Sequence, residues 1–107
     1  MSTTILTVGN NGSQLKAHPA DEIVVRLREN PSTGFRWQID QVDGPLTFNG
    51  ESFVLDSPPQ IGGGGVHEFR FLATAPGSAR LALRHWQAWE GESSVRERFS
   101  VDVTLMC

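Results

Sequence analysis

The side chains that could carry out catalysis are few in this chain of 107 residues, and they are widely spread. The single cysteine, Cys107, is the last residue, where a frayed terminus does not hold a thiol against a base. A single cysteine also excludes an internal disulfide and a cysteine-based zinc site. The histidines stand far apart, without cysteine or acidic companions at ligand spacing: His18, His67 and His85. The sequence therefore predicts neither a catalytic centre nor a metal or other cofactor.

The acidic residues and the glycine run also indicate no catalytic site. Asp40 with Asp43, and Glu90 with Glu92, are more typical of solvated loop charges than of paired catalytic acids. The glycine run at residues 62–65 lacks the Lys-Ser/Thr pair that follows a phosphate-binding loop, and no helical pattern opens behind it. We therefore expect that the protein is not an enzyme.

Residues 30–35, which read Asn-Pro-Ser-Thr-Gly-Phe, indicate a binding role and not a catalytic one. Pro31 fixes its own φ and biases the residue before it away from the helical region, while Gly34 can adopt the positive φ of a tight reversal. Ser32 and Thr33 stand at the apex with small side chains, so the exposed part is mostly backbone and narrow enough to enter a cleft. An ordinary turn uses the same residue types, and this stretch alone does not decide between the two interpretations.

Composition bounds the class of protein. A single domain over residues 1–107 is expected from the length, and 38% apolar with 20% charged residues is typical of a soluble globular protein. The net charge of -3 gives a phosphate backbone little to bind, so we expect no nucleic-acid partner. No apolar run is long enough to span a membrane. The N-terminus carries no visible secretory signal, which leaves the localisation open between the cytoplasm and a compartment reached by a leader since removed.

Apolar and polar residues alternate between clusters of Gly, Pro and Asn at spacings of roughly ten residues, which is typical of short strands. No sustained helical period and no internal repeat is visible. The pattern predicts an all-β fold, an immunoglobulin-like β-sandwich of about seven to eight strands. The expected strands cover residues 3–8, 15–18, 22–29, 35–40, 46–55 as a hairpin turning at Asn49-Gly50, 66–73, 79–84 and 95–105.

The alternation also predicts which side chains form the core. Trp37 is expected to pack in the core, in a place comparable to the buried Trp on the third strand of immunoglobulin-like sandwiches. His67 is expected beside the inward residues of its strand. The other predicted core residues are Ile23, Val25, Leu27, Phe69, Phe71, Ala79, Leu81, Leu83, Phe99, Val101, Val103 and Leu105.

Three unusual connections follow from this strand order. Residues 30–34 leave the second main strand, the glycines at 62–65 precede the fifth, and residues 84–91, with two tryptophans, join the sixth to the seventh. In an immunoglobulin-type sandwich these three connections share one end. A stiff apex, a stretch without side chains and an aromatic, cationic patch would then lie side by side, as in a recognition surface.

These segments resemble those of the chagasin-type inhibitors of papain-like cysteine peptidases. That family is marked by an Asn-Pro-Thr-Thr-Gly-Tyr/Phe loop, a Gly-rich loop and an Arg-Pro-Trp/Phe loop, and the order and separations agree over nearly the whole chain. The matching residues are Asn30, Pro31, Ser32, Thr33, Gly34 and Phe35, followed by Trp37; Gly62, Gly63, Gly64 and Gly65; and Arg84, His85 and Trp86.

The resemblance implies a monomeric, reversible protein inhibitor whose partner is a papain-like cysteine peptidase and whose three loops wedge into the active-site cleft. Thr33 and its flanking backbone would cover the catalytic cysteine without presenting an aligned scissile carbonyl. The glycines would let the second loop approach one wall of the cleft through its backbone. Trp86 would stack on an aromatic side chain of the other wall, with Arg84 supplying hydrogen bonds or an ion pair.

The chain departs from the family pattern at two positions. Ser32 replaces a Thr and keeps the hydroxyl, so little effect is expected. His85 stands where the family has Pro, so the third loop loses a fixed φ and is expected to be less pre-organised, at a cost in affinity. A plain exposed loop histidine is the simpler interpretation of His85.

A second interpretation is an immunoglobulin-like binding module that uses Trp86 and Trp89 as a platform for carbohydrate or peptide. Trp89 taken alone is more typical of an aromatic that packs at the rim. The two interpretations differ at Thr33, which a peptidase inhibitor requires and a platform does not. A third possibility is a domain whose loops only close the sandwich.

Overall fold

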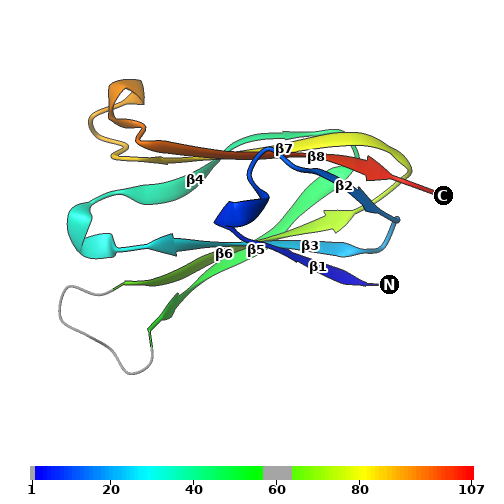
Figure 1. Cartoon of the computed structure of the whole chain (residues 1–107), viewed down its shortest axis with the longest axis horizontal. Coiled ribbons are helices and arrows are strands. Elements are labelled where there is room, and N and C mark those ends of the chain that lie inside the picture. Colours follow the sequence, from blue (N-terminus) through cyan, green and yellow to red (C-terminus); the bar gives the residue numbers. More distant parts are fainter. Residues whose placement is uncertain (1, 57–63) are drawn as a thin grey trace.

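The computed structural model describes residues 2–56 and 64–107 of the chain and consists of strands joined by turns and three short 3-10 helices (Figure 1). The eight strands are β1 (Thr3–Leu6), β2 (Gln14–Ala17), β3 (Glu22–Glu29), β4 (Arg36–Asp43), β5 (Leu46–Leu55), β6 (Gly65–Ala73), β7 (Gly77–Trp86) and β8 (Glu97–Leu105). The 3-10 helices are η1 (Val8–Asn10), η2 (Pro31–Thr33) and η3 (Glu92–Ser94). The predicted all-β class is confirmed.

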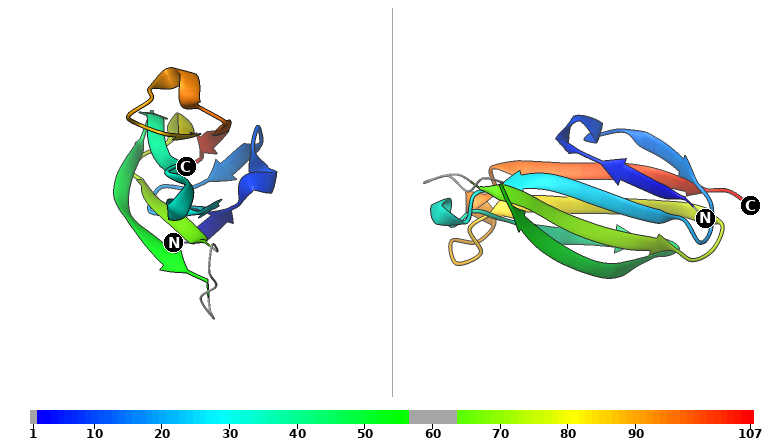
Figure 2. Two further views of the ribbon diagram at one scale, coloured as in Figure 1. Left: turned by 90° about the vertical axis from the view of Figure 1, so that its left-hand side faces the viewer. Right: turned by 90° about the horizontal axis from the view of Figure 1, so that it is seen from below.

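The strands form two four-stranded sheets that pack face to face, as the views in Figure 2 show. One sheet has the order β1-β3-β6-β5 and the other β2-β8-β7-β4. β1 runs parallel to β3 and β2 parallel to β8, while all other neighbours are antiparallel. This order places the strands as in an immunoglobulin-type sandwich, with the first strand divided between the two sheets. The predicted sandwich is therefore confirmed.

One apolar core lies between the sheets and receives side chains from both. Every side chain predicted to face inward from β3, β6, β7 and β8 is buried, and Trp37 of β4 is buried with them. These positions follow the two-residue period of a strand, since alternate side chains of a pleated strand point to opposite faces. The predicted core role of Trp37 is confirmed.

The predicted hairpin at residues 46–55 is wrong. β5 is one continuous strand that pairs with β6 along its whole length, and Asn49 is an extra residue between the pairs Phe48–Phe71 and Gly50–Arg70. Gly50 has a φ of 122°, a conformation that a bulge and a turn both use. The long partner strand bonds both halves of β5, whereas a hairpin with such short arms would be marginal.

Two predicted loops also have different bounds from those expected. Gly65 is the first residue of β6 and pairs with both Glu29 and Leu55, so it does not belong to a loop. Arg84, His85 and Trp86 are the last three residues of β7 and not part of a loop. The third loop therefore consists of residues 87–96, and it contains η3.

The first loop (residues 30–35) and the third loop lie at one end of the sandwich, and both termini lie at the other (Figures 1 and 2). The first loop joins β3 to β4 and so crosses from one sheet to the other. Among the described residues, no helix is long and apolar enough to cross a membrane.

Candidate functional site

The first loop is held in shape by its own polar groups. Asn30 caps η2, because its Oδ1 accepts hydrogen bonds from the Ser32 backbone N–H at 3.1 Å and from the Ser32 hydroxyl at 2.7 Å. The Thr33 hydroxyl donates to the Asn30 carbonyl oxygen at 2.8 Å and accepts from the Phe35 backbone N–H at 3.2 Å. Gly34 closes the turn with a φ of 77° and an N–H bonded to the Pro31 carbonyl at 3.1 Å. The expected stiff turn with a positive φ at Gly34 is present.

The apex of this loop is open to solvent. Pro31, Ser32 and Thr33 are exposed, whereas Gly34 and Phe35 are partly covered. A narrow, exposed and internally bonded backbone segment results, and its shape is set before any partner arrives.

The first and third loops touch each other. The Gln87 side-chain amide donates to the Thr33 carbonyl oxygen at 3.3 Å. The indole of Trp89 covers Gly34 so closely that a Cβ placed on Gly34 would lie 2.5 Å from its Cη2 atom. Trp89 is nevertheless 69% exposed, so the rest of its ring faces solvent. The sequence interpretation of Trp89 as a packing aromatic at the rim agrees with this arrangement.

The glycine segment reaches the same place through the residues that the structure describes. Gly64 is buried against the Glu29 carbonyl and the Cα of Asn30, and a Cβ at Gly64 would overlap that backbone. The Asp56 backbone N–H donates to the Gly64 carbonyl at 3.0 Å, and both Asp56 carboxylate oxygens accept from Arg28 at 2.7 Å. Gly62 and Gly63 of the predicted site lie outside the described residues.

Gly65 is required by the sheet, and not only by the binding role that the sequence suggested for the glycine motif. A Cβ on Gly65 would overlap the Val54 carbonyl oxygen of the neighbouring strand. This glycine is therefore required by the close approach of β5 to β6, whether or not a partner is bound.

Residues from all three predicted segments line one cavity of about 370 Å³ at this end of the sandwich. Asn30 and Thr33 come from the first segment, Gly64 from the second and His85 from the third. Its remaining lining residues are Arg28, Glu29, Arg96 and Glu97. Segments more than fifty residues apart in the sequence are thus brought together on one surface.

Arg84 and Trp86 are engaged with neighbours of their own. The Arg84 guanidinium carbon lies 3.6 Å from the centroid of the Trp86 ring, and the indole N–H donates to the Gln38 side chain at 2.8 Å. Arg84 also lies 3.6 Å from Asp40 and 3.2 Å from Glu92. These contacts order the Trp86 ring, which keeps part of its surface exposed.

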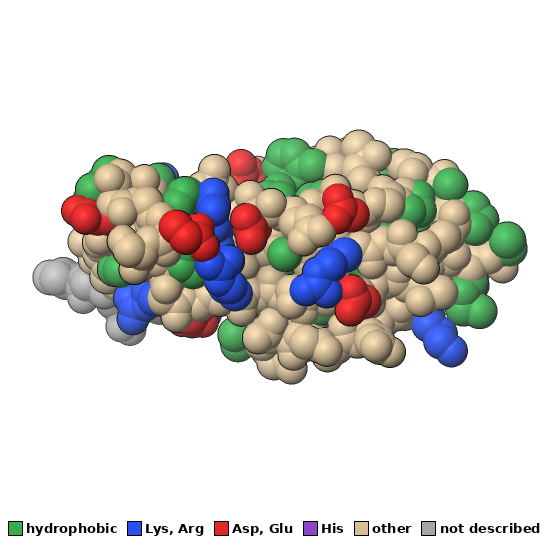
Figure 3. Space-filling model, turned by 90° about the horizontal axis from the view of Figure 1, so that it is seen from above, with side chains coloured by type: hydrophobic (Ala, Val, Ile, Leu, Met, Phe, Trp, Pro, Cys, Tyr) green, Lys and Arg blue, Asp and Glu red, His purple; other side chains and the backbone are tan. Residues whose placement is uncertain are grey.

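A charged network on the outer face of the β2-β8-β7-β4 sheet supports the third loop. Arg98 pairs with Asp40 at 3.5 Å and also with Glu92, so that two arginines and two carboxylates alternate. The Arg98 hydrogen bond lowers the pKa of Glu92 most, and Arg84 adds to that effect. Figure 3 shows basic and acidic side chains side by side over this face toward the loop end.

His85 differs most from its sequence interpretation as an exposed loop histidine, which is wrong. It is only 9% exposed, and its ring stacks on Trp37 with centroids 4.8 Å apart and an interplanar angle of 10°. Neither ring nitrogen has a hydrogen-bond partner among the described residues. Desolvation by burial lowers the pKa of His85, although Glu97 and the Phe35 backbone act in the opposite direction. His85 pairs with Trp37 of β4 on one side and with Glu97 of β8 on the other, so the sheet holds its backbone in place of the fixed φ of a proline.

The sequence analysis missed the carboxylate at the base of the first loop. The Glu29 side chain is 3% exposed, and its Oε1 accepts a hydrogen bond of 2.6 Å from the Trp37 backbone N–H. The same oxygen lies 3.0 Å from Nδ1 of His67. A signal was present, because Glu29 continues the inward register of Ile23, Val25 and Leu27, where a charged residue is unexpected.

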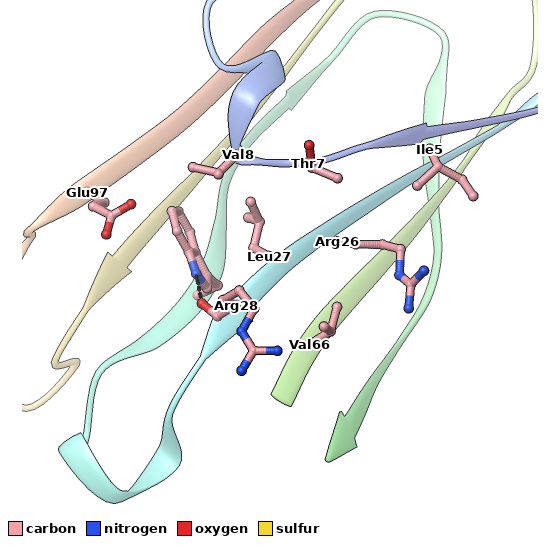
Figure 4. Close-up of a pocket in the computed structure, with 9 residues that line it drawn as sticks. Ile5, Thr7, Val8, Arg26, Leu27, Arg28, Val66 and Glu97 are labelled. Atoms are coloured by element: carbon pink, nitrogen blue, oxygen red, sulfur yellow. Dashed lines mark hydrogen bonds between the residues drawn. The ribbon is translucent and has the colours of Figure 1, made fainter. Parts of the chain in front are cut away.

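Two further cavities border this surface. One of about 270 Å³ is lined by Gly34, Trp86 and Trp89 together with polar residues that include Glu51 and His67. The other, of about 480 Å³, opens at the sandwich edge between η1, β3 and the start of β8 (Figure 4). Its lining includes Val8, Leu27 and Trp37, and the Trp37 indole N–H donates to the Arg28 carbonyl there at 3.0 Å. It contains none of the predicted binding residues.

No group of three or more His, Cys, Asp or Glu side chains in the described part of the chain is arranged to hold a metal ion. What the surface offers is a pre-shaped backbone wedge flanked by aromatic rings. Such a surface suits recognition of another protein more than a chemical step.

Comparison with known proteins adds independent information. The family model described as "Chagasin family peptidase inhibitor I42" matches residues 16–103. The chain is 29% identical over 102 residues to chagasin of Trypanosoma cruzi, a match that covers 90% of this chain and 92% of chagasin. It is 26% identical over 93 residues to amoebiasin-1 of Entamoeba histolytica, covering 85% and 89% of the two chains.

Solved structures share the fold. The cysteine protease inhibitor EhICP2 from Entamoeba histolytica superposes with a TM-score of 0.86 at 20% identity, covering 99% of this chain and 97% of that one. Amebosin in solution gives 0.79 at 25% identity, covering 96% and 97%. PbICP-C, solved in complex with falcipain-2, gives 0.67 at 14% identity, covering 96% and 99%.

Proposed function

Because this chain belongs to the chagasin family of peptidase inhibitors, we propose that it is a reversible inhibitor of papain-like cysteine peptidases that inserts the loop end of the sandwich into the active-site cleft. The family consists of inhibitors and not enzymes, as expected from the lack of catalytic side chains. We propose that residues 1–107 act as one monomeric inhibitor domain. A relative by fold, PbICP-C, has been solved in complex with the peptidase falcipain-2, which supports a partner of this class.

The observation that carries the proposal is the convergence of the three predicted segments on one surface. Asn30, Thr33, Gly64 and His85 line the same cavity, and Gln87 bonds directly to Thr33. A cleft between two walls requires a central wedge and flanking contacts on both sides. The first loop would provide the wedge, and Gly64 of the second segment and His85 of the third lie beside it.

The hydrogen bonds within the first loop support a block of the catalytic cysteine without cleavage. The Thr33 hydroxyl is bonded both to the Asn30 carbonyl and to the Phe35 N–H, so the apex resists the extended conformation that a cleaved peptide must adopt. A loop that is ordered before binding also loses less conformational entropy on association. Thr33 and its flanking backbone would therefore cover the nucleophile as a stable plug.

Arg84 and Trp86 are proposed as the anchor on one wall of the cleft. The guanidinium covers one face of the indole, and Gln38 fixes its N–H, so the ring is presented in one orientation. Rigid aromatic side chains with an Arg neighbour are the typical source of binding energy in protein interfaces. Trp89, which is more exposed, is proposed as a second aromatic contact.

His85 and the glycines have different places in this proposal. His85 is buried under the surface, so we propose that it acts by stacking on Trp37 and not by touching the peptidase. Gly64 packs closely against the backbone of Glu29 and Asn30, and the backbone of residues 62–65 is proposed to approach the other wall of the cleft.

The test is titration of the protein into papain or a cathepsin L-like peptidase while substrate hydrolysis is followed. We expect stoichiometric loss of activity with the parent protein. Thr33→Ala and Trp86→Ala are each expected to weaken inhibition by about 1–3 kcal/mol, because one removes a brace of the wedge and the other an anchor. The matched control is Thr104→Ala, an exposed threonine of β8 at the far end of the sandwich.

The same experiment separates the platform interpretation from the inhibitor. A platform built from Trp86 and Trp89 for carbohydrate or peptide should keep its affinity for its ligand in Thr33→Ala, whereas an inhibitor should bind the peptidase more weakly. Unchanged hydrolysis at excess parent protein across several papain-like peptidases would exclude the proposed function.

A further inference from the structure

The carboxylate of Glu29 fastens the two arms of the first loop to each other. Glu29 is the last residue before the loop, and its Oε1 accepts the N–H of Trp37, two residues past its end, at 2.6 Å. Because β3 and β4 belong to different sheets, this bond crosses the sandwich at the base of the wedge. We propose that Glu29 and His67 are positioning residues of the first loop, and that the charge of His67 sets how firmly the loop is held for the peptidase.

His67 extends this link into the other half of its sheet. Its Nδ1 lies 3.0 Å from Glu29 Oε1, and its Nε2 lies 2.6 Å from Glu51 Oε2 on β5. The ring is 14% exposed and stacks on Phe69, with centroids 4.1 Å apart. One chain of contacts thus runs from β4 through β3 and β6 to β5, directly under the first loop.

With both carboxylates ionised, the geometry requires a charged imidazole. Each ring nitrogen of His67 faces a carboxylate oxygen, which can only accept when ionised. A protonated ring donates to both Glu29 and Glu51. A neutral ring has a single N–H, so its other nitrogen would turn a lone pair toward a carboxylate at hydrogen-bond distance, and one of the two contacts must open.

The surroundings favour that charged state. Burial disfavours the charge of His67 most strongly, but hydrogen bonds with Glu29 and Glu51 prevail and raise its pKa above the ordinary 6.5. Burial also opposes the ionised form of Glu29, yet the bonds from His67 and from the Trp37 N–H lower its pKa below 4.5. The other ionisable groups that line the neighbouring cavities or act on this pair are Arg28 of β3, Arg36 of β4, His85 of β7, Arg96 of the third loop and Glu97 of β8.

The direction of the pH effect follows from these shifts. A base with a raised pKa contributes its stabilisation fully below its unperturbed pKa, and the contribution is lost as the pH rises through the raised value. An acid with a lowered pKa contributes above its unperturbed pKa and loses its effect as the pH falls through the lowered value. The link is therefore complete between the lowered pKa of Glu29 and the raised pKa of His67, and alkaline pH releases it.

The proposal rests on the proposed function and adds pH control to it, so the first experiment compares inhibition constants. The inhibition constants of the parent and of His67→Gln are measured on one peptidase from about pH 5.5 to about pH 9. Their ratio at each pH cancels the titration of the peptidase itself. We expect the variant to be roughly five- to tenfold weaker at the acidic end, which is about the effect of one lost hydrogen bond, with a ratio near one at the alkaline end.

The variant Glu51→Gln leaves the buried contact between Glu29 and His67 in place, because the Glu51 side chain itself is half exposed. It removes one partner of His67, and the pH at which the parent loses affinity should move to a lower value. A direct contact of Glu51 with the peptidase would instead change affinity by the same factor at every pH. Glu68→Gln is the matched control, since Glu68 is an acid on β6 that pairs with Arg26 and Arg70 and not with His67.

A second measurement follows the free protein, so that the inference does not depend on inhibition. In a nuclear magnetic resonance titration, we expect the backbone amide signals of Thr33, Gly34 and Trp37 to change with the midpoint of the His67 ring. That midpoint should be lower in Glu51→Gln and unchanged in Glu68→Gln.

The outcomes are distinguishable. If the parent inhibits but its ratio to His67→Gln is flat with pH, or if the loop amides do not follow the His67 ring, the positioning role is refuted and the proposed function stands. If the parent inhibits no papain-like peptidase, the proposed function fails, and the loop amides alone decide whether His67 positions the first loop.

Discussion

At the scale of the residue, His85 carries a cost in stability that its position explains. Its ring fills the space against Trp37, but both nitrogens are buried without hydrogen-bond partners in the described structure. A buried polar atom without a partner keeps the penalty of losing water. The aromatic ring is therefore useful at this site, whereas its polar atoms are not.

The replacement His85→Phe should stabilise the protein. Phenylalanine keeps the stack on Trp37 and removes the two desolvated nitrogens, so we expect the free energy of unfolding to rise by about 1 kcal/mol at neutral pH. The gain should grow as the pH falls below 6.5, because unfolding lets His85 take up a proton that burial denies it in the folded state. Urea unfolding at several pH values measures this difference.

His85→Ala is the size control for this prediction. It also removes the nitrogens but leaves a void beside Trp37, so it should lower stability. A His85→Phe protein that is less stable than the parent at every pH would mean that the two ring nitrogens of His85 carry no desolvation penalty.

At the scale of the element, β5 and β6 show how a glycine motif can serve the sheet itself. Gly65 pairs with residues on both neighbouring strands, and a Cβ would meet the Val54 carbonyl. Gly50 lets β5 form a bulge and stay paired on both sides of it. These glycines hold β5 and β6 in register up to the edge of the loop end.

Gly65→Ala should destabilise the fold. The added methyl group must displace backbone of the neighbouring strand, which we expect to cost about 1–3 kcal/mol of unfolding free energy. Gly9→Ala is the matched control, because the nearest atom to a Cβ at Gly9 is the Thr7 hydroxyl oxygen at 3.9 Å. Equal stability of the two variants in urea unfolding would mean that β5 and β6 do not approach as closely as described.

At the scale of the whole molecule, the two sheets depend on one core. The buried cluster contains Ile23 and Phe71 from one sheet and Leu81 and Phe99 from the other. Neither sheet can bury its inner face alone. The loop end is therefore held by both sheets. The first loop joins one sheet to the other, and the third loop contacts the first through the bond from Gln87 to Thr33.

Phe99→Ala should weaken both sheets together. Phe99 is fully buried, and its truncation is expected to cost about 3–5 kcal/mol of unfolding free energy. Tryptophan fluorescence, which reports the core through Trp37, and far-ultraviolet circular dichroism should give coincident urea transitions in the parent and in the variant. Thr104→Ala, an exposed change on the same strand, should stay within about 0.5 kcal/mol of the parent. Separate transitions would show that the sheets unfold independently.

Much of the fold was predictable from local patterns. The inward faces of β3 and β8 follow from alternation, and the positive φ of Gly34 follows from the chemistry of a turn. The hairpin error at Asn49-Gly50 arose because a bulge and a hairpin turn favour the same residues. The error at residues 84–86 arose because His85 is polar, although it continues the inward register of Leu81 and Leu83.

The amino-acid sequence by itself determined the strand period, the stiff turn at residues 30–35 and the family to which the chain is similar, because these depend on neighbouring residues and on motif spacing. Only the tertiary structure decided that Trp89 covers Gly34, that Gln87 bonds to Thr33, and that Glu29 and His67 meet beneath the first loop. Such contacts join residues far apart along the chain. Their partners depend on how two twisted sheets pack, which no local pattern encodes.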